Sequence, residues 1–189
     1  MKISQLDKTN FYFVSLNVEP YDFEDYNLYH PTDEAQEFIK YYAERSVITS
    51  ASIGYINGKT LVVKVFEQDE KTILENLISS INKFEGRKLA GWGVANNILP
   101  FMIKRSIILG LPIPYDFGDI APWSKDFLDV QKMWGFGAIN NPHLDEVHSV
   151  LVPEPIDGTD IYKVAEIFLR VVEGSFIEKV EVREESKTE

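Results

Sequence analysis

Two pairs of acidic side chains have spacings that could bind metal ions. Asp22-Phe23-Glu24 is an Asp-x-Glu motif, which can place two carboxylates on one side of a strand for a two-metal site. The motif follows Pro20 within residues 19–37, a stretch with seven acidic residues and no lysine or arginine. We therefore interpret it as a solvated acidic loop. Asp157 and Asp160 flank a glycine and are typical turn residues.

Other catalytic chemistries have weaker support in the sequence. The three histidines are His30, His143 and His148, and the last two are five residues apart, which is not the i, i+4 spacing of zinc ligands on a helix. Residues 54–60 resemble a phosphate-binding loop but have one residue too few between the glycines, and a strand is expected to follow. A zinc enzyme and a P-loop protein are therefore both disfavoured, and the absence of a Gly-x-Ser-x-Gly motif disfavours a serine hydrolase.

The composition of the 189-residue chain is that of a soluble globular protein, with 44% apolar and 26% charged residues. Thirty acidic and 19 basic residues give a formal charge of −11, which disfavours a surface that wraps a polyanion. There is no cysteine, which excludes disulfides and thiolate metal sites. The chain starts without an apolar signal segment and has no run long enough to span a membrane, so we expect a cytoplasmic protein with no membrane partner.

Apolar periodicity and turn residues predict the elements that must position these side chains. Asn57-Gly58 lies between two runs rich in β-branched residues and indicates a hairpin, and Asp69 should cap the helix that follows it. The order of elements predicts an α/β fold whose sheet has antiparallel and parallel pairs. We expect one domain over residues 1–177 and a charged, frayed tail over 178–189. Strands are expected at 10–18, 47–55, 60–66 and 88–92, and helices at 32–44, after 69, from 96 or 97 to 109, at 126–134, at 142–151 and after a turn at 156–159.

Several segments together resemble a known family. The clearest is Leu89-Ala90-Gly91-Trp92, followed by Leu99-Pro100-Phe101-Met102-Ile103-Lys104-Arg105. Further segments are Ile48-Thr49-Ser50-Ala51-Ser52-Ile53-Gly54-Tyr55, Gly110-Leu111-Pro112-Ile113-Pro114, Leu128-Asp129 and Ile156-Asp157-Gly158-Thr159. Their order over residues 10–173 is similar to that in the predicted 3′–5′ exonucleases related to the exonuclease domain of family B DNA polymerases. The resemblance implies a ribonuclease H-like fold. It also implies removal of nucleotides from a 3′ end by two Mg²⁺ or Mn²⁺ ions held by four acidic side chains, the DEDD type.

The resemblance assigns the first metal-ligand positions to the first strand, where the family has Asp-x-Glu. Aligning Pro20 with the family's proline places Ser15 and Asn17 at these positions. A shift of two residues instead places Asn17 and Glu19 there, and one of the two ligands is then still an amide.

The other two acidic positions are also altered. The aspartate of the family's second motif aligns with Ile98, or with Asn97 after a shift of one residue. The last motif, before the final helix, is deleted, and Asp160 is the one acid available in its place. These changes remove about three negative charges from the metal site, whereas Mg²⁺ requires anionic oxygen ligands.

We therefore expect the exonuclease architecture with a degenerate active site, and no cofactor. The predicted role is a nucleic-acid-binding or partner-binding module, with single-stranded nucleic acid or a protein as the partner. The first alternative is an active nuclease with a rearranged Mg²⁺ or Mn²⁺ site. Its ligands would be Glu19, Asp157 and Asp160, with Asp22 and Glu24 as further candidates.

A second alternative is a protein-interaction domain without a role in nucleic-acid binding. The acidic stretch at 19–37 would repel phosphates near the site, which favours this alternative. A local basic edge would favour nucleic acid instead, and its residues would be Lys104, Arg105, Lys125 and Lys132.

Overall fold

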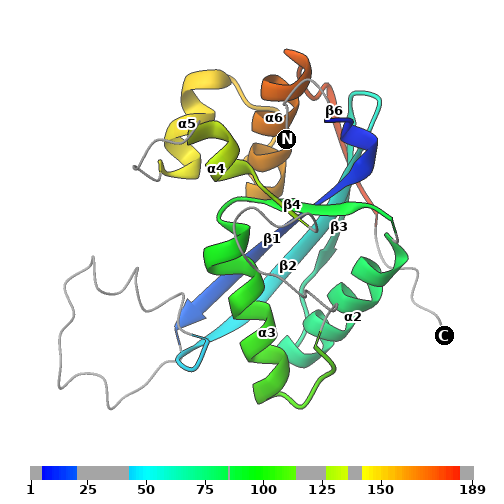
Figure 1. Ribbon diagram of the computed structural model, residues 1–189, viewed down its shortest axis with the longest axis vertical. Coiled ribbons are helices and arrows are strands. Elements are labelled where there is room, and N and C mark those ends of the chain that lie inside the picture. The colour runs from blue at the N-terminus through cyan, green and yellow to red at the C-terminus, as the bar shows by residue number, and fades with distance from the viewer. Residues whose placement is uncertain (1–5, 21–42, 85, 114–126, 136–141, 184–189) are drawn as a thin grey trace.

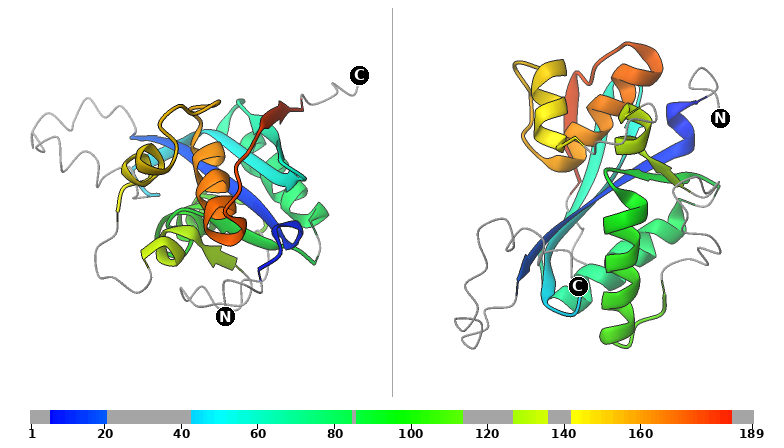
Figure 2. Two further views of the ribbon diagram at one scale, coloured as in Figure 1. Left: turned by 90° about the horizontal axis from the view of Figure 1, so that it is seen from above. Right: turned by 60° about the vertical axis from the view of Figure 1, so that its left-hand side comes forward.

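A six-stranded sheet with helices on both faces makes up the computed structural model, which describes residues 6–20, 43–84, 86–113, 127–135 and 142–183 (Figures 1 and 2). The strands are β1 (Phe11–Pro20), β2 (Ser46–Asn57), β3 (Thr60–Phe66), β4 (Lys88–Gly91), β5 (Phe127–Asp129) and β6 (Lys179–Val182). The α-helices are α2 (Glu70–Lys83), α3 (Leu99–Ile108), α4 (Val130–Gly135), α5 (Leu144–Leu151) and α6 (Asp160–Glu173). The 3₁₀ turn η2 (Lys8–Asn10) precedes β1, and the π-helical turn η4 (Val94–Ile98) precedes α3.

The strand order confirms the expected fold class. It is β5-β4-β1-β2-β3-β6. β2 pairs antiparallel with both β1 and β3, whereas β4 pairs parallel with β1 and β5 pairs parallel with β4. An antiparallel meander that continues into parallel strands, with helices on both faces, is the ribonuclease H-like arrangement. No helix of the described residues is long and apolar enough to cross a membrane.

The local signals in the middle of the chain are confirmed. Asn57 pairs with Thr60 at the end of the β2–β3 hairpin, and Gly58 adopts a φ of 62°, as the turn requires. Asp69 caps α2 and accepts a hydrogen bond from the Thr72 amide at 3.1 Å. The predicted helix at 32–44 lies outside the described residues, apart from residues 43 and 44.

Two predicted helix starts are wrong. Residues 127–129 are a strand, because Phe127 and Leu128 pack into the cores on opposite faces of the sheet, and helix α4 begins only after Asp129. The helix predicted from Asn96 or Asn97 has no asparagine cap. Instead, the chain turns at Gly93 (φ 65°) and forms the π-helical turn η4, and α3 follows directly from η4.

The C-terminal residues are more ordered than predicted. Lys179–Val182, which we expected to fray, pair in parallel with Thr60–Val63 of β3. The Glu178 amide extends the ladder by donating to the Lys59 carbonyl at 2.8 Å. Val180 packs against the core on the α6 side, whereas Val182 is exposed, and the charged residues beside them obscured the strand signal.

Side chains of β1 alternate between two cores. Tyr12 and Val14 pack with α2 and α3, whereas Phe11 and Phe13 pack with α6 on the other face. The Phe168 ring of α6 lies 5.1 Å from the Phe11 ring and 5.3 Å from the Phe13 ring, measured between centroids. The alternation determines which face each later residue of β1 occupies.

Candidate functional site

The second half of β1 carries the first two positions that the resemblance assigns to metal ligands. Ser15 and Asn17 continue the alternation of Phe11 and Phe13, so they lie on the α6 side of the sheet. Figure 1 shows that this end of β1 extends beyond α5 and α6. Both positions are therefore placed where a solvent-facing site can form.

Neighbouring side chains at these positions are neutral. Ser15 pairs with Ser52 and Asn17 with Ser50 across the β1–β2 ladder. The Asn17 amide Nδ2 donates to Ser50 Oγ at 2.8 Å. We name these four residues the polar strip. It offers hydroxyl and amide groups but no anionic oxygen, so its affinity for divalent ions is expected to be low.

Ile98 lies on the other side of the sheet. Its side chain is 9% exposed and belongs to the core formed with α2 and α3, next to Leu99 and Met102. Gly91 makes room for it, since a Cβ there would lie 3.0 Å from Ile98 Cδ1. The structure thus does not bring Ile98 together with Ser15 and Asn17. Asn97, the shifted candidate, packs against Gly93.

Two of the three acids of the alternative metal site already accept local hydrogen bonds. Glu19 is exposed at the end of β1, opposite Val47. Asp157 accepts the Thr159 amide at 2.6 Å, as a turn residue does. Asp160 accepts Lys163 Nζ at 3.2 Å at the start of α6. Within the described part of the chain, no three histidine or acidic side chains lie close enough to hold a metal ion. Asp22 and Glu24 lie outside it.

One buried acid has a structural role that the sequence analysis missed. Asp129 at the end of β5 is 3% exposed, and its Oδ1 accepts the backbone amides of Gly93 at 3.2 Å, Gln131 at 3.1 Å and Lys132 at 3.3 Å. Its Oδ2 has no hydrogen-bond partner among the residues that the structure describes. Burial raises the pKa of Asp129, although the amide hydrogen bonds oppose this effect. An acid directly before a helix was the signal that could have revealed this cap.

Arg105, one of the four residues of the predicted basic edge, does not lie on the surface. Arg105 is 1% exposed and forms a buried ion pair, with Nε donating to Glu70 Oε1 at 2.8 Å and Nη2 to Glu70 Oε2. It also donates to the Ala43 carbonyl at 2.9 Å. Lys104 pairs with Glu44 at 3.0 Å on the surface. Lys125 lies outside the described residues, and Lys132 is only half-exposed.

His148 is buried between α5 and α6. It is 4% exposed, and its ring meets Tyr162 edge-on at 5.5 Å between centroids. Its Nε2 has no partner among the described residues. Burial and the nearby Lys163 lower the pKa of His148, while Glu166 and Asp145 act in the opposite direction.

This lowered pKa predicts a loss of stability in mild acid. The folded state favours neutral His148. Its contribution to the free energy of unfolding is therefore complete above the unfolded pKa of about 6.5, and it is lost as the pH falls toward and through the lower pKa of the folded state. Urea unfolding at pH 7.5 and 5.5 should show a lower free energy of unfolding at pH 5.5. His148→Phe keeps an aromatic ring and should reduce this difference. An equal difference in wild type and variant would assign the effect to other groups.

The strand order and the flanking helices define a mixed α/β domain, consistent with a ribonuclease H-like fold. No protein-family model matches the chain, and no curated protein sequence matches it. Among solved structures, the chain is similar to the family B DNA polymerase from the hyperthermophilic archaeon Pyrobaculum calidifontis, with 15% identity and a TM-score of 0.48. The match covers 74% of this chain and 18% of the polymerase, so the chain spans less than a fifth of that protein.

Proposed function

We propose that this chain is a catalytically inactive domain of exonuclease-like fold that functions by binding a protein partner. The observation that carries this proposal is the chemistry of the positions assigned to metal ligands. Ser15 and Asn17 belong to a neutral polar strip, and Ile98 is a core residue on the opposite face. A fold can retain its core after its site has lost the original chemistry.

Mg²⁺ and Mn²⁺ do not fit the residues at these positions. Both ions require anionic oxygens converging on one point. In place of such oxygens there are a hydroxyl, an amide and a hydrocarbon. Asp160, at the start of α6, is paired with Lys163, whose charge opposes a second cation. We derive no metal-dependent step for this chain.

The distribution of positive charge favours a protein partner over nucleic acid. A nucleic-acid surface needs several cations free to contact phosphates. Arg105 is buried against Glu70, and Lys104 is paired with Glu44, so two of the four cations of the expected basic edge are neutralised. The formal charge of −11 adds long-range repulsion of a polyanion.

A nuclease assay with Mn²⁺ tests the loss of catalysis. We expect no shortening of 5′-labelled single-stranded DNA or RNA, and no Mn²⁺ binding tighter than about millimolar in an electron paramagnetic resonance titration, because a site without carboxylates binds hard cations poorly. Glu19→Gln and Asp160→Asn are the matched controls. Turnover that disappears in either variant would establish the rearranged nuclease instead.

Oligonucleotide binding tests the choice of partner. We expect no measurable binding of a twelve-residue oligothymidylate at physiological salt by fluorescence anisotropy. Tight binding that weakens as salt increases would contradict a protein partner and support a nucleic-acid-binding module.

A further inference from the structure

The turn between α2 and β4 contains three cations that form no ion pair with a described acidic residue. Elsewhere in the described chain, most basic side chains form ion pairs, namely Lys8–Glu173, Lys59–Glu178, Lys104–Glu44, Arg105–Glu70, Lys163–Asp145, Arg170–Glu166 and Arg183–Glu181. The side chains of Lys83, Arg87 and Lys88 form no ion pair or hydrogen bond with a described residue. With Glu85, the six-residue segment carries a formal charge of +2.

Arg87 is held in place by aromatic rings. Its guanidinium carbon lies 5.2 Å from the Tyr55 ring centroid and 5.5 Å from that of Phe84. The Phe84 ring stacks on buried Tyr12 at 5.0 Å and meets Tyr55 edge-on at 5.8 Å. The Arg87 amide also donates to the Phe84 carbonyl at 2.9 Å. Because these contacts fix the side chain, ordering it on binding costs little entropy.

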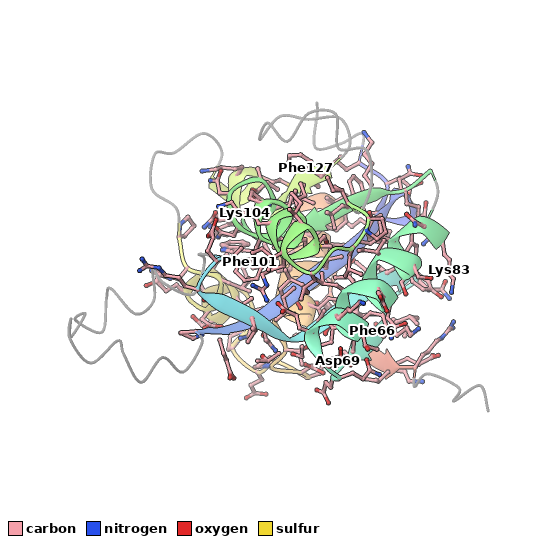
Figure 3. The ribbon with its side chains drawn as sticks, turned by 90° about the horizontal axis from the view of Figure 1, so that it is seen from below. Phe66, Asp69, Lys83, Phe101, Lys104 and Phe127 are labelled. Atoms are coloured by element: carbon pink, nitrogen blue, oxygen red, sulfur yellow. The ribbon has the colours of Figure 1, made fainter. Side chains whose placement is uncertain are left out.

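The guanidinium therefore presents a pre-positioned fork of N–H donors that no other described residue uses. Such a fork matches the two oxygens of a carboxylate in a bidentate pair. Lys83 is exposed and Lys88 half-exposed in the same turn, so both add positive charge near the fork. Figure 3 shows Lys83 at the end of α2 opposite to Asp69, away from the negative charge at the start of that helix.

A short acidic peptide fits this turn better than a nucleic acid does. Phe84 is already covered by Tyr12 and Arg87, so it offers no free platform for stacking a base. Three cations within six residues can neutralise only a short anionic segment. A longer polyanion would extend onto the surface of a chain whose net charge is −11.

We propose that three cations of this turn, Lys83, Arg87 and Lys88, bind an acidic segment of a partner protein. One carboxylate pairs with the Arg87 fork, and flanking carboxylates interact with Lys83 and Lys88. The site lies at the end of α2, apart from the polar strip on the α6 side of the sheet. This inference rests on the proposed binding function and gives the chemistry of the partner.

Titration of the full chain with a fluorescein-labelled twelve-residue peptide of alternating Glu and Gly tests the inference. We expect salt-dependent binding that Arg87→Gln weakens by about tenfold or more, since a bidentate charge pair is lost. Arg87→Lys keeps the charge but not the fork of donors, so its peptide affinity should lie between those of wild type and Arg87→Gln. Lys83→Gln and Lys88→Gln should each weaken binding by a few-fold, about the effect of a peripheral charge.

Lys71→Gln is the matched control, because Lys71 is an exposed lysine without an ion pair at the other end of the same helix. It should leave peptide affinity unchanged, and amide NMR spectra should show that Arg87→Gln is folded. The inference is overturned by absence of peptide binding, by equal losses in Lys71→Gln and Arg87→Gln, or by a preference for oligothymidylate that depends on Arg87. If the peptide fails to bind while the nuclease and oligonucleotide assays remain negative, the assignment of this turn as the binding site is wrong, and the proposed binding of a protein partner is not affected.

Discussion

Replacing Arg105 by methionine is expected to lower the free energy of unfolding by about 3–5 kcal/mol, because it leaves the Glu70 carboxylate largely buried without its cation. The Arg105 side chain is 2% exposed and that of Glu70 is 12% exposed. The ion pair joins α2, α3 and the Ala43 carbonyl, and the Ile48 amide of β2 also donates to Glu70 at 2.9 Å. Urea unfolding monitored by circular dichroism measures the loss.

A double-mutant cycle separates the ion pair from general packing. Glu70→Gln retains an acceptor for the Ile48 amide, so Arg105→Met combined with Glu70→Gln should be less destabilised than the two single losses added together. Lys104→Met, which breaks the exposed Lys104–Glu44 pair next to it, should cost less than about 1 kcal/mol. Equal losses for Lys104→Met and Arg105→Met would show that the buried pair has no special role.

Asp129→Ala should be the second most destabilising change, by about 2–3 kcal/mol, since it removes the shared acceptor of three backbone amides. Asp129→Asn should cost much less, because its carbonyl oxygen can still accept these hydrogen bonds while the charge is removed. Chemical unfolding of both variants measures this difference. A loss in Asp129→Asn as large as that in Asp129→Ala would mean that the negative charge itself is required.

The pH dependence of the same variants tests the raised pKa of Asp129. The folded state holds the proton more tightly than the unfolded state, so the contribution of Asp129 to stability is greatest below the unfolded pKa of about 3.9. It declines as the pH rises through the folded pKa. Wild type should therefore lose stability relative to Asp129→Asn as the pH rises above 4. A constant difference between the two proteins would contradict this interpretation.

Short-range signals in the sequence predicted much of the fold. Asn57-Gly58 and Asp69 each act on residues within one turn, so their roles follow from local geometry alone. Phe127 and Leu128 were assigned to a helix because three residues contain too little periodicity to distinguish a strand. Their identity as β5 depends on pairing with β4, which is a contact between distant parts of the chain.

The side chains missed in the sequence analysis depend on tertiary contacts. Arg105 was named as one residue of a basic edge, but it pairs in the interior with Glu70, 35 positions earlier. The sequence showed which residue types occupy the positions assigned by the family resemblance. It could not show that Ile98 and Asn17 lie on opposite faces of the sheet, since this depends on how η4 leaves β4.

The C-terminal strand has a consequence for synthesis of the polypeptide. β6 adds to the outer edge of β3, and Glu178 and Lys59, whose hydrogen bond begins that pairing, are 119 positions apart. During translation, the outer edge of β3 therefore remains open until nearly the whole described chain has left the ribosome. An uncovered strand edge is a site for intermolecular pairing, so the nascent chain is open to such pairing in the interval before β6 emerges.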